Sequence, residues 1–310
     1  MKAFDNQALS DLISQSTRHP DGCQYYPHVA ISTDTLLSGV HFPEQTTAAA
    51  IAHKSMAVNL SDLAAMGAMP QSWTLGLVLP DWDESWLIDF CSGLSGLLDR
   101  WPMQLQACDV CKGPLSVNIQ VQGGLPRGQA LRRDRAKPGD LIFVSGTPGD
   151  AGFALACHFD QLPYPQNAQD YLQHRLEYPE PRVELGLALL PIANAAIDIS
   201  DGLAADLQHI LDESHVGAKI ALEELPASLA LSALSADKQL RFQLAGGDDY
   251  ELCFTLAPEL QDMLRQTLSQ ISVNCTCIGE ITQDLQLEFM QNGHKTDLSV
   301  QGYQHFSLQE

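Results

Sequence analysis

Apolar segments of two lengths alternate along the chain, and polar or charged residues separate them. The shorter segments predict strands at 29–33, 73–79, 103–107, 115–123, 141–147, 195–200, 249–256 and 275–281. The longer ones have helical spacing and predict helices at about 47–66, 86–98, 181–192 and 202–214. Residues 115–123 alternate between apolar and polar, which is typical of a half-exposed antiparallel strand.

A basic segment that contains proline and glycine, residues 127–140, interrupts this pattern and is the best candidate for a domain boundary. The 310 residues, of which 45% are hydrophobic, suffice for two cores. We therefore expect an α+β protein of two domains, 1–138 and 139–310. Each domain would be a mixed or antiparallel sheet covered by helices, and the first sheet would carry its helices on one side.

The charge of the chain limits its partners. Its 38 acidic and 17 basic residues give a formal net charge of −21, so nucleic acid and anionic membranes are poor partners. A polyphosphate ligand would need metal ions to neutralise it. No apolar stretch reaches the ~20 residues of a membrane span, and the N-terminus lacks the pattern of a secretory signal. Cysteines inside apolar runs, such as Cys157 and Cys253, suggest core residues of a protein in the reducing cytoplasm.

Carboxylates follow or interrupt apolar elements in four segments. In the first, Ser32, Thr33 and Asp34 come at the end of a predicted strand and offer oxygen atoms that suit a hard cation. The competing interpretation is a polar turn. In the second, Asn59 and Asp62 lie one turn apart in an alanine-rich helix. There the alternative is a helix break with Ser61 or Asp62 as the cap of a new helix.

The third segment places Asp198 and Ser200 on one side of a strand, with Asp201 at the start of the next helix. A helix cap explains Ser200 or Asp201, but it does not explain a carboxylate at Asp198 beside a second acid. The fourth segment has the pair Asp248–Asp249 after two glycines, which is also a good hairpin turn. Taken together, the four segments favour one metal-binding cleft over four independent turns.

Several familiar motifs are missing from the sequence. It contains no GxxxxGK[ST], GxSxG or HExxH, and residues 146–152 (GTPGDAG) are only a weak candidate for a phosphate-binding loop. Cys108 and Cys111 have the spacing of a zinc or redox pair, but no second CxxC accompanies them. A P-loop enzyme or a zinc protein is therefore a poor interpretation.

The order of the segments ISTDT, VNLSDLAAMGA, KPGD, VSGTPGD, IDISDGL, GGDDYELCF and GYQHF resembles the thiamine-monophosphate kinases of the aminoimidazole ribonucleotide synthetase superfamily. The resemblance covers nearly the whole chain. It implies that fold, a homodimer joined through the N-terminal sheets, and direct transfer of phosphate from ATP to thiamine monophosphate with several Mg²⁺ ions. No dedicated catalytic base is implied, because the attacking group is already an anionic phosphate.

The resemblance also implies roles for individual residues. The metal ligands would be Ser32, Thr33, Asp34, Asp62, Asp109, Asp198 and Asp201, together with Asp21 if its altered segment reaches the ions. ATP would contact Cys108, Asp109, Arg133 and Ser200. The acceptor would contact His41, Asp248 and Tyr303, with the tyrosine stacked on a cationic ring.

Two segments depart from the family pattern. The family has a GxGDDAA-like segment before the first strand, where this chain retains only Asp21, and it has GGDT where this chain has Ala107–Val110. Asp248 also stands in place of the usual glutamate. Two alternatives therefore remain open: a weakly active or inactive protein that binds nucleotide or thiamine phosphates, and a kinase of the superfamily with another acceptor.

Overall fold

The computed structural model describes residues 24–26, 28–159, 161–298, 300 and 302. Two of the predicted site residues, Asp21 and Tyr303, lie outside the described residues. Within the part of the chain that is described, no helix is both long and apolar enough to cross a membrane.

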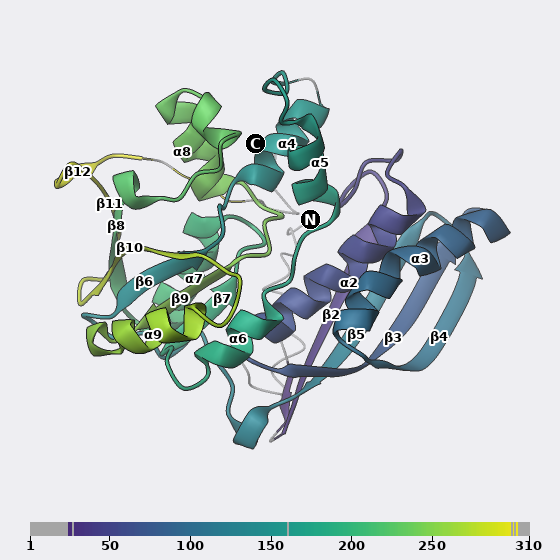
Figure 1. Ribbon diagram of the computed structural model, residues 1–310, viewed down its shortest axis with the longest axis horizontal. Coiled ribbons are helices and arrows are strands. Elements are labelled where there is room, and N and C mark those ends of the chain that lie inside the picture. Colours follow the sequence, from purple (N-terminus) through teal and green to yellow (C-terminus); the bar gives the residue numbers. More distant parts are fainter. Residues whose placement is uncertain (1–23, 27, 160, 299, 301, 303–310) are drawn as a thin grey trace, which may run out of the picture.

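The N-terminal unit contains a five-stranded sheet. Its strands are β1 (Gln24–Tyr26), β2 (Val29–Leu37), β3 (Met69–Leu79), β4 (Gln104–Lys112) and β5 (Ser116–Gly124). They lie in the order β1-β2-β5-β3-β4, and only β3 and β4 pair in parallel. Helices α2 (Ala48–Ala65) and α3 (Glu84–Arg100) cover one face of the sheet, as the sequence predicted (Figure 1).

The C-terminal unit contains a seven-stranded mixed sheet. Its strands are β6 (Leu141–Ser145), β7 (Ala195–Asp198), β8 (Gly217–Ala221), β9 (Leu252–Leu256), β10 (Cys275–Thr282), β11 (Leu287–Gln291) and β12 (His294–Thr296). The order is β12-β11-β8-β10-β6-β9-β7, with β8 and β11 parallel. Its helices are α4 (Asp150–His158), α5 (Gln169–Glu177), α6 (Val183–Leu189), α7 (Leu203–Ser214), α8 (Ala236–Ala245) and α9 (Gln261–Leu268). The prediction of a two-part α+β fold is confirmed.

Helix α2 is the element that joins the two units. Thr47 caps its first turn by accepting a hydrogen bond of 3.3 Å from the N–H of Ala50. Alanines then let the helix pack closely on both sides, against β2 and β5 of its own sheet and against α6 and β7 of the other unit. A Cβ atom at Gly186 of α6 would lie only 1.9 Å from the carbonyl oxygen of Ala64, so glycine is required there.

One hydrophobic core runs through this contact, from Val121 in β5 to Phe254 in β9. Because the core is continuous between the sheets, the domain boundary between residues 138 and 139 stays a prediction. Residues that lie between the two units are therefore held in place by a packed interface and not by a flexible hinge.

Several predicted elements have different limits in the structure. β2 continues to Leu37, so Asp34 lies within the strand and not at its end. β4 continues from 103–107 to Lys112, while β9 begins only at Leu252. α2 is unbroken through Asp62, which excludes the helix break. The sequence reading did not identify α4, α5, α8 or α9.

Candidate active site

Three carboxyl groups from distant parts of the sequence meet where the two units pack together. Asp34 comes from β2, Asp62 from α2 and Asp198 from the end of β7. The Asp34 and Asp62 side chains share a hydrogen bond, and both interact electrostatically with Asp198. The structure thus brings three of the predicted metal ligands into one place.

Two serine hydroxyl groups hold these carboxyl groups in position. Ser32 on β2 donates a hydrogen bond to Oδ2 of Asp62. Ser32 and Asp34 are two residues apart on a strand, so both side chains point to the face that α2 covers. Ser61 on α2 donates a hydrogen bond of 2.7 Å to Oδ2 of Asp198. Each serine therefore links two of the elements that form the cluster.

Burial and mutual repulsion raise the pKa values of these acids. Desolvation and then the charge of Asp198 raise the pKa of Asp34 to about 6. Desolvation and the charges of Asp34 and Asp198 raise the pKa of Asp62 well above its usual range. Burial likewise raises the pKa of Asp198, although the hydrogen bond from Ser61 opposes this effect. The ionised cluster is unfavourable by itself and would be stabilised by a bound cation.

Arg133 and Asp201 lie within electrostatic range of the cluster. The positive charge of Arg133 lowers the pKa of both Asp62 and Asp198, against the larger effect of burial. The negative charge of Asp201 raises the pKa of Asp198. Both residues were predicted site residues, one for ATP and one for metal, and the structure places Arg133 near Asp62 and Asp198 and Asp201 near Asp198.

The loop after β7 owes its shape to Asp206 on the first turn of α7. A single oxygen of this side chain, Oδ2, accepts the backbone N–H groups of Ser200 at 3.0 Å, Asp201 at 3.0 Å and Gly202 at 3.1 Å. Burial raises the pKa of Asp206 well above its usual range, and the nearby acids add to this effect. The backbone of the predicted ATP and metal residues is therefore fixed by a side chain behind it.

The two described residues predicted to face the acceptor, His41 and Asp248, are joined through Lys54 of α2. The Lys54 ammonium group donates to Oδ2 of Asp248 at 2.9 Å and to the carbonyl oxygen of His41 at 3.2 Å. The hydroxyl group of Tyr250 donates to Oδ1 of Asp248 at 2.9 Å, and the backbone N–H of Asp248 donates to the carbonyl oxygen of Ser200 at 2.8 Å. The predicted acceptor residues thus lie beside the loop after β7.

Three predicted residues lie apart from the cluster within one chain. Thr33 alternates with Asp34 along β2, so its exposed side chain points to the opposite face of the sheet. Cys108 and Asp109 are exposed on the edge strand β4, three strand positions from β2, a distance of about 14 Å. Their assignment to metal and ATP stays a prediction.

The donor atoms in the cluster suit a hard cation that also binds phosphate. Among the described residues, no three histidine, cysteine or acidic side chains converge tightly enough to hold a metal ion alone. Mg²⁺, however, usually takes only one or two carboxylates from a protein and completes its shell with water and substrate phosphates. Oδ2 of Asp34 is buried without a hydrogen-bond partner, so an acceptor atom is available for such an ion.

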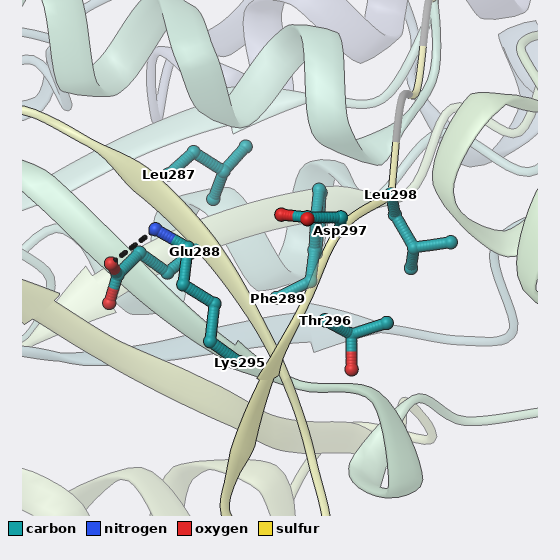
Figure 2. A pocket seen from close by; sticks show the side chains of 7 residues that line it. All are labelled: Leu287, Glu288, Phe289, Lys295, Thr296, Asp297 and Leu298. Carbon is teal, nitrogen blue, oxygen red and sulfur yellow. Dashed lines mark hydrogen bonds and ion pairs between the residues drawn. The ribbon is translucent and has the colours of Figure 1, made fainter.

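A shallow pocket elsewhere in the C-terminal unit is a poor candidate for the site. Its lining comes from β11, β12 and the residues after them, including Leu287, Phe289 and Leu298 (Figure 2). It contains the ion pair of the half-buried Glu288 and the exposed Lys295, and it belongs to the opposite edge of the sheet from β7. It therefore lies far from Asp198.

Sequence reasoning missed three residues of the site: Lys54, Asp206 and Tyr250. A signal existed for Lys54, because it precedes Asp62 by eight residues in an alanine-rich helix and so shares its face. Asp206 and Tyr250 carry no comparable signal, since helix-start acids and tyrosines next to strands are common. Their roles depend on contacts between elements.

Residues 21–125 match the family described as AIR synthase related protein, N-terminal domain, and residues 137–290 match its C-terminal domain. The thiamine-monophosphate kinase of Escherichia coli K12 is 48% identical over 284 residues, which cover 90% of this chain and 87% of that protein.

Solved structures give the same result. The thiamine-monophosphate kinase of Stenotrophomonas maltophilia K279a superposes with a TM-score of 0.81 at 44% identity, over 86% of each chain. The structure of AaThiL complexed with AMPPCP and TMP superposes with a TM-score of 0.85 at 27% identity, over 99% of each chain.

Proposed function

Because the chain belongs to the AIR synthase related family, and within it to the thiamine-monophosphate kinases, we propose that it transfers the terminal phosphoryl group of ATP to thiamine monophosphate and forms thiamine diphosphate. The observation that carries this proposal is the convergence of Asp34, Asp62 and Asp198 between the two units. Such a cluster suits a reaction that joins two phosphate-bearing molecules.

The chemistry of the reaction explains why acids and not bases surround the site. The acceptor is a phosphate whose second pKa is about 6, so it is anionic at neutral pH without a general base. The main barrier is repulsion between two polyanions that must be held in line. Bound Mg²⁺ would supply charge neutralisation and a fixed geometry for both phosphates.

We assign the metal ligands by their position where the two units pack together. Asp34, Asp62 and Asp198 would hold the ions, with Ser32 and Asp201 beside them. Thr33, Asp109 and Asp21 remain part of the proposal on the strength of the family resemblance. For ATP, the charge of Arg133 close to Asp62 and Asp198 supports a phosphate contact, and Ser200 lies on the loop that Asp206 fixes.

The acceptor would lie on the side of the carboxyl cluster that carries His41 and Asp248. Their shared partner Lys54 supports this placement, since it sets both groups against the same face of α2. Tyr303 and Cys108 complete the proposed contacts to acceptor and ATP, respectively.

We also propose that the protein is a homodimer joined through the N-terminal sheets and that it acts in the cytoplasm. Among the described residues of this unit, α2 and α3 lie on one face of the first sheet and no helix covers the other, and β4 is exposed along its length. The seven cysteines in the described part of the chain are all free, as expected in a reducing compartment. Light scattering would give the mass of two chains, and a single-chain mass would remove the dimer from the proposal.

A second candidate is a protein that binds the same ligands without turnover. The position of Cys108 and Asp109 on the edge strand, away from the carboxyl cluster, favours it. A coupled assay of ADP release with Mg²⁺, ATP and thiamine monophosphate separates the candidates. Turnover supports the kinase, binding without turnover supports the second candidate, and turnover only with another acceptor contradicts both.

A further inference from the structure

We propose that Lys54 is a positioning residue for the acceptor: its buried ammonium group fixes Asp248 and the His41 segment at a set distance from the carboxyl cluster. The inference rests on the proposed function, because Asp248 and His41 are assigned there to the acceptor. The inference extends that assignment to Lys54, whose own contacts, burial and position on α2 carry it.

Lys54 is a buried cation that links the two units. It is 3% exposed, and its 2.9 Å ion pair with Asp248 joins α2 of the N-terminal unit to the segment before β9. Its second bond, of 3.2 Å, reaches the carbonyl oxygen of His41. The ring of His41 is itself held, because Nδ1 accepts the backbone N–H of Leu37 at 3.0 Å. One side chain thus fixes both acceptor segments.

Stability alone is a poor explanation for this lysine. Transfer of an ammonium group out of water costs several kcal/mol, and a well-packed apolar side chain of similar volume often serves the fold as well or better. The surroundings on α2 are apolar, with Ile51 and Val58 buried on neighbouring turns. A cation at this position is better explained by the two groups that it orients, the carboxylate of Asp248 and the backbone at His41.

Helix α2 sets the distance between the two parts of the site. Lys54 and Asp62 lie two turns apart on one face of the helix, which corresponds to about 12 Å along its axis. Asp62 belongs to the carboxyl cluster, and Lys54 holds Asp248. The same rigid element therefore positions both the proposed metal ligands and the proposed acceptor contact.

The segment that carries Asp248 needs such a fixed contact because its backbone is strained. Asp248 and Tyr250 have φ values of +67° and +54°, which non-glycine residues adopt at a cost of roughly 1–3 kcal/mol each. Both oxygens of the Asp248 carboxylate are engaged, Oδ2 by Lys54 and Oδ1 by the hydroxyl group of Tyr250. Each oxygen keeps a lone pair for an acceptor that bears an amino group or a cationic ring.

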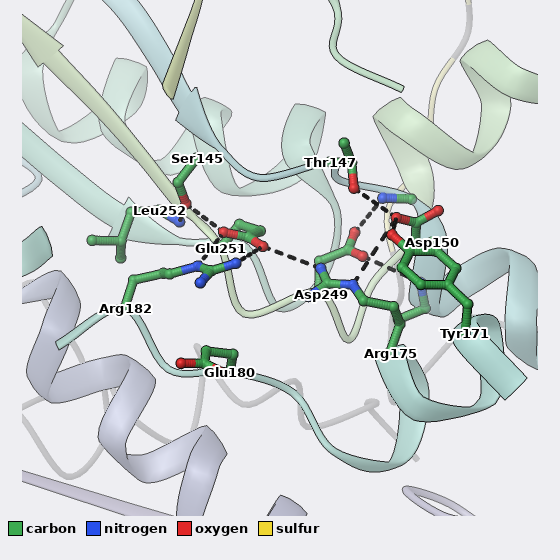
Figure 3. A network of polar contacts seen from close by, with 12 residues as sticks. Ser145, Thr147, Asp150, Tyr171, Arg175, Glu180, Arg182, Asp249, Glu251 and Leu252 are labelled. Atoms are coloured by element: carbon green, nitrogen blue, oxygen red, sulfur yellow. Dashed lines mark hydrogen bonds and ion pairs between the residues drawn. The ribbon is translucent and has the colours of Figure 1, made fainter. Parts of the chain in front are cut away.

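The other side of this segment is anchored by a separate polar network (Figure 3). Asp249 accepts the N–H groups of Gly149 at 2.5 Å and Ala151 at 3.3 Å, at the start of α4. Glu251 accepts two hydrogen bonds of 2.6 Å from Arg182. Alternate residues of the segment thus point to opposite sides, and Lys54 is the partner on the side that faces α2.

The charges around Lys54 agree with this placement. The pKa of Tyr250 is raised well above its usual range, by burial and then by the charges of Asp248, Asp34 and Asp198. The acceptor side and the metal cluster are therefore close enough to interact. A cation at Lys54 offsets the negative charge of Asp248 in a region that already holds the acids Asp34 and Asp198.

The test compares Lys54→Met with wild type and with Lys295→Met, which removes an exposed lysine from its ion pair with Glu288. Calorimetry in the presence of Mg²⁺ would measure binding of thiamine monophosphate and of AMPPCP separately. We expect Lys54→Met to weaken the binding of thiamine monophosphate about tenfold or more, which corresponds to about 1.4 kcal/mol. Its affinity for AMPPCP should stay within about twofold of that of wild type. Lys295→Met should change neither affinity.

A double variant distinguishes positioning from a general loss of structure. The double variant Lys54→Met/Asp248→Asn should lose no more affinity for the acceptor than the single variant with the larger loss, because both substitutions remove the same contact. Asp248→Asn alone tests the same link if Lys54→Met does not fold. Unchanged acceptor affinity in Lys54→Met, or equal losses for both ligands, would overturn the inference. Because the readout is binding, the inference is tested even if wild type shows no turnover and the proposed kinase reaction fails.

Discussion

Ser61 of helix α2 donates a 2.7 Å hydrogen bond to Asp198 at the end of strand β7, and this bond joins the two units at the carboxyl cluster. Both residues are buried, Ser61 at 0% and Asp198 at 4% exposure. The hydrogen bond lowers the pKa of Asp198 against the larger, opposite effect of burial. The cluster thus depends on a neutral donor as well as on its acids.

Ser61→Ala should therefore weaken Mg²⁺ binding, because Asp198 loses the donor that favours its ionised form and metal binding competes with the proton. We expect a stability loss of about 1–3 kcal/mol from the unsatisfied buried acceptor. Mg²⁺ titration and urea unfolding measure the two effects. Ser92→Ala removes an exposed serine of α3 and should change neither.

Asp62→Asn and Asp201→Asn should abolish Mg²⁺-dependent nucleotide binding and leave the fold intact. The amide keeps the size of the carboxylate but removes the charge that a divalent cation requires. Calorimetry with Mg²⁺ and AMPPCP, together with circular dichroism, measures both properties. Asp89→Asn on the exposed face of α3 is the matched control. Unchanged affinity in both site variants would refute the metal assignment.

In metal-free protein, Asp62→Asn should be at least as stable as wild type. The folded-state pKa of Asp62 is raised, so above the unfolded pKa of about 4 the wild type loses stability with rising pH, until the folded-state pKa is passed. An amide does not titrate and removes this penalty. Thermal unfolding in EDTA should show that the stability of Asp62→Asn relative to wild type rises from pH 5 to pH 8. A relative fall in its stability over this range would contradict the repulsion between Asp62 and the other acids of the cluster.

Glu251→Gln should destabilise the protein by about 3–5 kcal/mol at pH 7, because it leaves the buried end of Arg182 without its anion. Burial opposes ionisation of Glu251, but Arg182 and Arg175 outweigh it and lower its pKa. Its stabilising effect is thus present above the unfolded pKa of about 4.3 and is lost as pH falls through the lower folded-state value.

The difference in unfolding free energy between wild type and Glu251→Gln should therefore be constant near neutrality and shrink below about pH 4. Urea unfolding at a series of pH values measures it. Glu259→Gln, at an exposed position before α9, serves as the control and should behave as wild type. If the difference in unfolding free energy between wild type and Glu251→Gln does not depend on pH, the charge of Glu251 does not contribute to stability.

The sequence predicted most of the elements that carry the site. β2, α2, β7 and α7 have strong periodic or apolar patterns, and the acids within them are predicted from the sequence to form one cluster. This worked because a carboxylate inside an apolar element is costly and requires a partner. The convergence of Asp34, Asp62 and Asp198 follows from that requirement.

What the sequence did not predict depends on tertiary packing. Asp109 was expected after a strand that ends at 107, but parallel pairing with β3 extends β4 to Lys112. Asp248 and Asp249 were read as a hairpin turn or a start of β9, but they form a strained segment held from both sides. The partner of Lys54 could not be predicted from its position on the helix, because Asp248 lies 194 residues away.

The most direct test of the account is a crystal structure with AMPPCP, thiamine monophosphate and Mg²⁺. We predict Mg²⁺ ions in contact with Asp34, Asp62 and Asp198, located between the terminal phosphate of the analogue and the phosphate of the acceptor. A structure in which the nucleotide is bound but all Mg²⁺ ions lie elsewhere, with none in contact with these three side chains, would contradict it.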